Sequence, residues 1–401
     1  MSYESYETRL TEILATGNNE PMLSGEQRVL APLAAHLRDS IHAKYDRLVA
    51  EGHNPEILTP DWCRENPTEA GELHAEIIVK TYGSTYALPN KDPIANKAAI
   101  EEGNLDIYLL KTNGSVVGTA CLVNMGDGRA ELGRSASLGS VGNSIIQDLR
   151  ILDWLVNPEA AAKYHTLFTT LRSAPDRQID EDDGRVFTMR GGQGVTAHWK
   201  KFPGLIVSGF GPLYLKHGSL EQFSCASITR QELARDVNVF IADEDDVTFV
   251  ESWHDNYQIP RPKLIEGSGE AAIRFDAHYP PKESGLTNLV HADIVSNDSG
   301  VLLADALSQV EEAGSPFMQV VIPIDRDTRS LQNELKSQGY QVFGYQPAFT
   351  EQSPVLLFGK VKPGIEVVPT FWEDGSEANP FWQNEQLLQD SKRIASKWKI
   401  D

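Results

Sequence analysis

The feature that most constrains the fold is a series of extended segments that ends in a glycine-bearing turn and an amphipathic helix. Two β-rich runs within residues 107–123 flank Asn113-Gly114, the residue pair preferred in two-residue hairpin turns. A third extended run, 130–138, leads into Gly139-Ser-Val-Gly-Asn-Ser144, and apolar residues recur at helical spacing over 145–156. This order predicts three antiparallel strands followed by a turn and a helix.

Helical and extended patterns alternate along the rest of the chain. Before the hairpin, Ser24-Gly-Glu-Gln27 indicates a capping box for a helix that ends near Gly52, and a second helical pattern covers 70–81. After it, we expect strands at 165–171, 205–210, 212–215, 237–242, 271–276, 289–295, 317–324, 340–345 and 355–361, and helices at 195–202, 300–313 and 328–337. The element order of 289–361 repeats that of 131–215, which indicates an internal duplication.

Length and charge limit the classes of function. With 401 residues, 40% of them hydrophobic, the chain is long enough for two domains. Its formal net charge of −21 opposes binding to nucleic acids and anionic membranes, because no basic patch offsets it. Three widely spaced cysteines favour reduced thiols, and neither a signal peptide nor a membrane span is evident. We therefore expect a cytoplasmic protein.

The order of hairpin, third strand, glycine turn, helix, strand, helix and final strand resembles the acyltransferase fold of the GNAT superfamily over about Glu72 to Gly218. Residues 130–137 are similar to that family's fourth strand, and Gly139 to Ser144 occupy its acyl-CoA pyrophosphate loop. Residues 82–89 are similar to a segment before the second strand of some amine acetyltransferases. The resemblance implies a mixed α/β sheet and acetyl-CoA or another acyl-CoA as co-substrate.

Two GNAT-like domains in tandem are the predicted organisation. An N-terminal helical extension (1–71) precedes an acyl-CoA-binding domain (72–225), a degenerate GNAT-like domain (226–362) and a C-terminal tail (363–401). Residues 320–361 resemble the closing elements of a GNAT domain, whereas the loop at 296–300 has one glycine and an acid that would repel phosphate. We expect no acyl-CoA at the second loop.

The glycine turn is the predicted binding site for the co-substrate. Backbone N–H groups at a helix N-terminus suit a pyrophosphate, although glycines at such turns are often purely structural. The turn is shorter than the family's usual Arg/Gln-x-x-Gly-x-Gly/Ala loop and lacks a basic residue before its first glycine. The predicted contacts are Leu138, Gly139, Ser140, Val141, Gly142, Asn143 and Ser144.

Three residues are candidates for proton transfer. Amine acylation needs a base for the ammonium group and a proton donor for the departing thiolate. Glu131 begins the strand where several family members keep a general base, or it is an exposed carboxylate of a hairpin. His198 lies near the helix position of the family's thiolate-protonating tyrosine, or it is a structural histidine, and Tyr214 is a comparable donor.

Substrate contacts are assigned to Arg134, Tyr82 and Tyr86. Arg134 could bind a carboxylate on the substrate or pair with Glu131 or Asp127 across the hairpin. Cys121 lies in the middle of a strand among small neighbours, which favours a buried structural thiol. No spacing of His, Cys or Asp matches a metal site, so no metal is expected.

The resulting hypothesis is transfer of an acetyl or other short acyl group to the amino group of a small molecule. Two alternatives stay open. One is an aminoacyl transferase that uses charged tRNA, which the acidic balance opposes. The other is a non-catalytic ligand-binding or scaffold protein with decayed domains. The sequence leaves the amine, the acyl length and the oligomeric state undetermined, and a homodimer is compatible with it.

Overall fold

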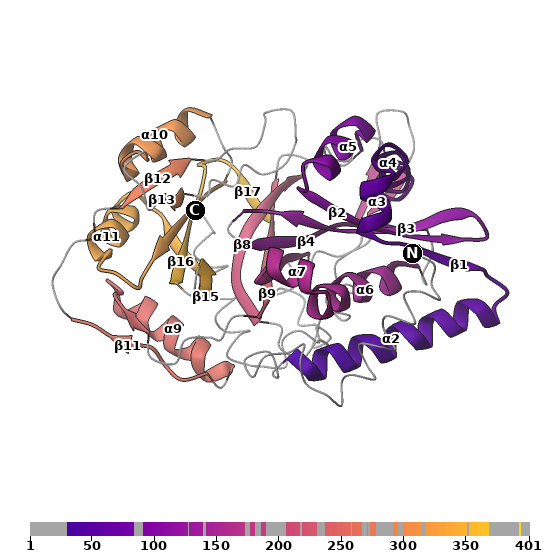
Figure 1. The fold of residues 1–401 in the computed structure, drawn as a ribbon. Coiled ribbons are helices and arrows are strands. Elements are labelled where there is room, and N and C mark those ends of the chain that lie inside the picture. Colours follow the sequence, from indigo (N-terminus) through magenta and orange to yellow (C-terminus); the bar gives the residue numbers. More distant parts are fainter. Residues whose placement is uncertain are drawn as a thin grey trace.

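The computed structural model contains alternating helices and strands, as the sequence patterns predict. The structure describes residues 30–83, 91–126, 128–138, 142–172, 177–180, 186–189, 206–216, 219–230, 237–257, 259–266, 271, 273–277, 292–295, 300–313, 317–350, 353–368 and 393. The fold class is mixed α/β, as predicted. Within these residues, helices lie on both faces of a mixed sheet (Figure 1).

The described chain has a first half, residues 30–230, and a second half, residues 237–368. The predicted hairpin is present in the first half. Strands β2 (Leu105–Thr112) and β3 (Ser115–Asn124) pair antiparallel, and Asn113 and Gly114 between them both have positive φ, at 51° and 78°. Positive φ at both central residues gives the turn a twist that matches the flanking strands. Strand β4 (Arg129–Ser137) then pairs antiparallel with β3.

Several helices and strands of the first half were not predicted from the sequence. Residues 55–67, for which the sequence patterns gave no helix or strand, contain β1 (Pro55–Leu58), which pairs with β2, and α3 (Pro60–Glu65). The short helices α5 (Pro93–Glu101) and α7 (Pro158–Lys163) and the strand β9 (Ser219–Thr229) are further additions. Helices of six or nine residues show too few turns for a clear apolar period.

Two helical layers cover the first half. On one face, α2 (Ala31–Ala50) and α6 (Gly142–Val156) share a core with β2 to β5. On the other face, α3, α5 and α4 (Pro67–Tyr82) pack over the sheet, as Figure 1 shows. The α2 and α6 helices are tied together by Asp148, which accepts hydrogen bonds at 2.7 Å from both Ser40 Oγ and Lys44 Nζ.

One sheet continues through both halves. Its strand order is β1-β2-β3-β4-β5-β9-β8-β15-β16-β14, where β5 is Thr166–Arg172, β8 is Ile206–Lys216, β14 is Phe317–Pro323, β15 is Gln341–Thr350 and β16 is Ser353–Val361. A short β17 (Glu366–Val368) pairs with the start of β9. Two separate sheets were expected, but β8 and β15 join them.

The remaining described elements are smaller. The second half also contains α9 (Glu244–Asn256), α10 (Leu303–Ala313) and α11 (Arg329–Ser337). Three two-stranded pairs stand apart from the large sheet: β6 (Arg177–Asp180) with β7 (Val186–Met189), β10 (Asn238–Val239) with β11 (Lys263–Leu264), and β12 (Arg274–Ala277) with β13 (Ala292–Val295). The predicted helix at 195–202 lies outside the described residues.

The predicted domain boundaries cut through elements of this structure. The boundary at 71 and 72 falls inside α4, and that at 225 and 226 falls inside β9. Residues 363–401 were expected to be a tail, yet β17 returns to pair with β9 of the first half. Apolar periodicity could not reveal these links, because strand pairing joins residues far apart in the sequence.

The centre of the sheet is arranged symmetrically. In each half the strand that comes last in sequence lies between two earlier ones, as β5-β9-β8 and as β14-β16-β15. The two halves meet where Gly209 of β8 pairs with Gly344 of β15. Both glycines begin a similar segment, Gly209-Phe-Gly-Pro-Leu-Tyr214 and Gly344-Tyr-Gln-Pro-Ala-Phe349. Glycine, aromatic, proline and aromatic residues thus recur at equal spacing.

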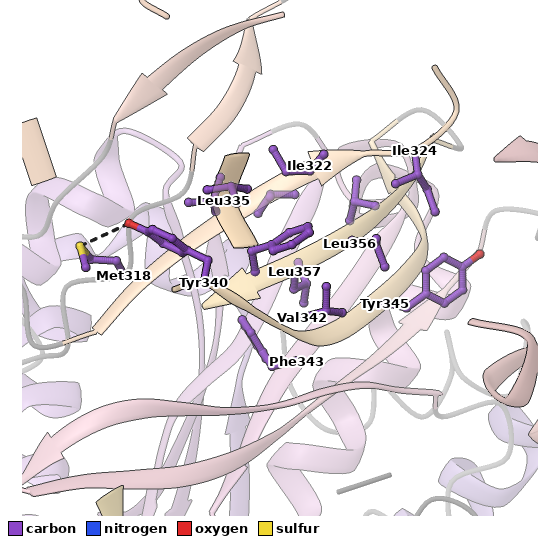
Figure 2. Close-up of a cluster of buried hydrophobic side chains, with 14 of the residues drawn as sticks. Met318, Ile322, Ile324, Leu335, Tyr340, Val342, Phe343, Tyr345, Leu356 and Leu357 are labelled. Atoms are coloured by element: carbon purple, nitrogen blue, oxygen red, sulfur yellow. Dashed lines mark hydrogen bonds between the residues drawn. The ribbon is translucent and has the colours of Figure 1, made fainter. Parts of the chain in front are cut away.

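The second half has its own apolar core. Figure 2 shows side chains from β14, β15, β16 and α11 interleaving around this part of the sheet, among them the buried Phe343, Leu335 and Leu357. The Tyr340 hydroxyl donates to Met318 Sδ at 3.5 Å, which supplies this buried polar group with a partner.

Candidate functional site

An opening in the sheet beside β4 is the candidate site. Strands β4 and β5 are parallel neighbours only at Arg129 to Glu131, opposite Thr166 to Phe168. Beyond Glu131, β4 pairs only with β3, whereas β5 pairs with β9 along its whole length. The Thr169 hydroxyl donates to the Leu132 carbonyl oxygen at 3.3 Å, close to the point of separation. The strands therefore diverge toward the C-terminal end of β4.

A β-bulge interrupts β4 within this opening. Cys121 of β3 lies opposite Gly133 and Thr119 lies opposite Ala136, so two β4 residues, Arg134 and Ser135, oppose the single Ala120. A bulge bends its strand and leaves part of the ladder unpaired, and bulges are common next to active sites. The edge of β4 that faces away from β3 therefore carries irregular backbone at the point where β5 diverges.

The buried guanidinium of Arg150 on α6 donates hydrogen bonds to the backbone next to this bulge. Its Nη1 donates to the carbonyl oxygens of Cys121 at 2.7 Å and of Gly133 at 3.0 Å, so one nitrogen contacts both strands. Burial lowers the pKa of Arg150 to about 10, which leaves it charged at neutral pH. The carboxylates of Glu131 and Asp148 favour that charge.

The N-terminus of α6 follows the open end of β4. After β4 ends at Ser137, Leu138 is exposed and α6 begins at Gly142, with no acidic residue in its first turn. The backbone N–H groups of a first helical turn lack partners within the helix and attract anions. Gly139 to Val141 lie outside the described residues, as do the side chains of Gly142 to Ser144.

Glu131 lies at the residue where β4 and β5 separate. Its side chain is half-buried on the same face of β4 as Gly133, where an added Cβ would meet Glu131 Oε2 at 3.3 Å. The carboxylate therefore lies over the strand rather than extending away from it. This places a titratable group between the parallel pairing and the bulge.

The other predicted site residues are less fully described. Arg134 is in the bulge and Tyr82 ends α4, but their side chains are not described. Tyr214 is in β8 opposite Glu221, with β9 and β5 between its strand and β4. His198 and Tyr86 lie outside the described residues.

A buried polar cluster lies between α4 and β3, and the sequence patterns missed it. His74 Nδ1 lies 2.7 Å from Thr119 Oγ1 and 3.8 Å from Cys121 Sγ, and all three side chains are buried. The expectation that Cys121 is a buried thiol is confirmed. His74 is 45 residues from Thr119 in sequence, so no local motif could have linked them.

A second polar feature lies at the opposite end of α6 from the glycine turn. A cavity of about 220 Å³ is lined by Asp153 near the end of α6 and by residues of α3, β2 and α7. Within it, Asp106 accepts from Arg64 at 2.9 Å and from Lys163 at 2.8 Å. These pairs neutralise the buried Asp106 carboxylate, so we assign them to the stability of the fold.

In the second half, two described residues before α10, Gly300 and Val301, pack against β12. Val301 precedes α10 and forms a bridge with Phe275 of β12, in which each backbone N–H donates to the other's carbonyl oxygen at 2.9 and 3.0 Å. A Cβ at Gly300 would meet Arg274 Cβ at 2.8 Å. The first turn of α10 also contains Asp305. The N–H of Val301 is thus already used by protein, and an acid lies nearby.

Comparisons with known proteins give structural likenesses but no sequence match. No family model matches the chain, and no curated protein does. A GNAT-family acetyltransferase from Streptococcus pneumoniae is 12% identical, with 44% of this chain and 99% of that chain covered and a TM-score of 0.30. An aminoglycoside 6'-N-acetyltransferase from Enterococcus faecium is 13% identical, with 44% and 97% covered and a TM-score of 0.29.

A third solved structure has a bound ligand. It is a GNAT-family acetyltransferase from Elizabethkingia anophelis with acetyl-CoA, 14% identical, with 38% of this chain and 88% of that chain covered and a TM-score of 0.25. In all three comparisons the matched region is less than half of this chain.

Neither a metal-binding cluster nor a membrane-spanning helix is present among the described residues. In that part of the chain, no group of three His, Cys, Asp or Glu side chains is arranged to hold a metal ion. No helix there is both long and apolar enough to cross a bilayer.

Proposed function

We propose that the protein transfers an acyl group from acyl-CoA to the amino group of a small molecule. The observation that carries this proposal is the separation of β4 from β5 beside the N-terminus of α6. An extended acyl-pantetheine arm can add to a free strand edge through backbone hydrogen bonds, while a helix N-terminus binds the pyrophosphate. The resemblance of the element order to the GNAT fold supports the same proposal.

We propose that the N-terminus of α6 fits acyl-CoA better than the N-terminus of α10. The first turn of α6 lacks acids and follows the exposed Leu138, whereas α10 has Asp305 and a bridged Val301. We therefore assign co-substrate binding to residues 138–144. The second half, with its symmetric strand order and recurring glycine, aromatic and proline residues, is proposed to be a duplicated copy without this site.

In the proposed reaction, the amine nitrogen attacks the acyl carbon, a C–N bond forms and the C–S bond breaks. Glu131 accepts the proton of the ammonium group, directly or through water, because it lies where the strands separate. The departing thiolate takes a proton from His198, the first of the two predicted donors. The second, Tyr214, lies on β8, with β5 and β9 between it and β4. Backbone N–H groups at the bulge would polarise the acyl carbonyl.

The acceptor is proposed to be a small cationic amine. A net charge of −21 favours the approach of a cation. The proposed substrate contacts are Tyr82, Tyr86 and Arg134. Tyr82 ends α4, which packs against β4 in a small apolar cluster, and Arg134 is in the bulge of β4. A carboxylate on the substrate would suit Arg134.

The experiment that tests this function has two parts. First, thermal unfolding is followed with acetyl-, propionyl- and longer acyl-CoA, since a ligand at 100 times its Kd adds roughly 2.7 kcal/mol of stability. Second, a panel of amines is screened with the stabilising acyl-CoA, with free thiol as the readout. Stabilisation together with amine-dependent thiol release supports the proposal. No stabilisation by any acyl-CoA would instead favour a non-catalytic binding protein.

A further inference from the structure

Arg150 is a charged side chain buried between α6 and the sheet, where Gln147 and Asp148 of the same helix are also buried. It belongs to α6, its exposed fraction is 1%, and its sequence neighbours Leu149 and Ile151 are fully buried. Its Nε has no hydrogen-bond partner within the described structure. A buried cation with an unsatisfied donor costs free energy that an aliphatic side chain of similar size would avoid. Packing of α6 therefore does not explain why arginine is present here.

The contacts of Arg150 converge on the bulge. Cys121 and Gly133 lie opposite each other on β3 and β4, at the last regular pair before Arg134 and Ser135. The Gly133 carbonyl oxygen accepts from Arg150 Nη1 at 3.0 Å and also from Ser135 Oγ at 3.3 Å. One guanidinium thus links both strands at the position where their regular register ends.

We propose that Arg150 is a positioning residue that holds the bulge of β4 in the shape required for acyl transfer. This inference rests on the proposed function, because the bulge borders the opening assigned to the acyl group. Arg150 does not reach the reactants itself. It acts through the backbone of Gly133, whose carbonyl direction sets the orientation of the following peptide groups at Arg134 and Ser135.

Two substitutions separate this role from simple support of the fold. Arg150→Met keeps much of the volume but removes both the charge and the donors, whereas Arg150→Lys retains a charged donor that can reach one or both carbonyls. Trp154→Phe is the matched control. Trp154 is also fully buried on α6, and its Nε1 donates to the carbonyl oxygen of Tyr164 at 2.7 Å, away from the bulge.

The first measurement is steady-state acyl transfer. For Arg150→Met we expect kcat to fall by about 10- to 100-fold, because small displacements of a reacting geometry have effects of this size. The KM for acyl-CoA should change by less than about threefold, since the α6 N-terminus is retained. Arg150→Lys should recover part of kcat, and Trp154→Phe should keep wild-type kcat per folded molecule. A wild-type kcat in folded Arg150→Met would overturn the proposal.

The second measurement is hydrogen exchange, which does not depend on activity. Backbone amides of 133–136 should exchange about tenfold faster in Arg150→Met, with little change in β2. Unchanged exchange at 133–136 overturns the positioning role even if the wild type is active. If the wild type acylates no amine, the proposed function fails and exchange alone decides the role of Arg150. If Arg150→Met does not fold, the same two readouts on Arg150→Lys decide it, and wild-type values for both overturn the proposal.

Discussion

Gly209 of β8 and Gly344 of β15 pair directly, and this pair joins the strands of the two halves. A Cβ added at Gly209 would lie 3.1 Å from Gly344 Cα and 3.2 Å from the Phe343 carbonyl oxygen. The backbones of β8 and β15 approach so closely that a side chain at Gly209 would require them to move apart by a few tenths of an ångström. The sequence similarity that begins at these two glycines places the same residue type on both sides of the junction.

Enlarging Gly209 should therefore loosen the junction. Gly209→Ala is expected to lower the free energy of unfolding by about 1–3 kcal/mol, and Gly209→Val by more, because the contacts are with backbone that cannot rotate away. Chemical denaturation of the series measures this. Equal stability of the alanine variant and the wild type would show that the two strands can separate without cost.

Glu131→Gln tests the proposed general base. The amide keeps the size and reach of the carboxylate, so acyl-CoA binding should persist while the acylation rate falls by about 10² to 10⁴. Raising the pH should restore part of the rate by supplying free amine. Glu56→Gln is the control, because Glu56 is an exposed carboxylate on β1. A rate above about half of the wild-type value, far outside the range for a general base, would make Glu131 structural.

Gly142→Asp tests the assignment of the pyrophosphate to the α6 N-terminus. A carboxylate in the first turn should lower the affinity for acyl-CoA by about tenfold or more through repulsion. Gly300→Asp is unsuitable as its control, since a Cβ at Gly300 meets Arg274 Cβ at 2.8 Å. Leu302→Asp is better matched, because Leu302 is 55% exposed directly before α10. Calorimetric titration should show a loss only for Gly142→Asp, and equal losses would contradict the assignment.

The pH dependence of stability should reveal the buried pair His254 and Tyr345. Their Nε2 and hydroxyl oxygen lie 2.9 Å apart, and Figure 2 shows Tyr345 at the edge of the apolar cluster. Burial lowers the pKa of His254 and raises that of Tyr345, so a neutral imidazole accepts from the hydroxyl. Below the ordinary histidine pKa of about 6.5, the unfolded chain binds a proton that the folded chain does not.

Stability should therefore fall as the pH drops below about 6.5, by at most about 1.4 kcal/mol per pH unit from this residue. The double variant His254→Phe, Tyr345→Phe removes the titration without leaving an unpaired hydroxyl. Its denaturation midpoints at pH 7.5 and 5.5 should differ less than those of the wild type. His53→Gln, at an exposed position, should behave as the wild type does. An unchanged pH dependence in the double variant would rule out His254 as the source.

Local patterns were sufficient for much of the first half. Asn113-Gly114 predicted the turn because both residues accept positive φ, and the apolar spacing of 145–156 predicted α6 because one helical face is buried against the sheet. The sequence alone also distinguished the glycine-bearing segment before α6 from the acidic segment before α10.

Tertiary structure decided how those elements combine. The insertion of β9 between β5 and β8, the pairing of Gly209 with Gly344 and the return of β17 to β9 all join residues far apart in the chain, so no local period records them. The glycine, aromatic and proline residues shared by 209–214 and 344–349 were readable in the sequence, but only the strand register showed that they meet. The same holds for Arg150. Helical spacing places it on α6, and only packing shows that its charge is buried against two carbonyls at a bulge, because burial and register are properties of the assembled sheet.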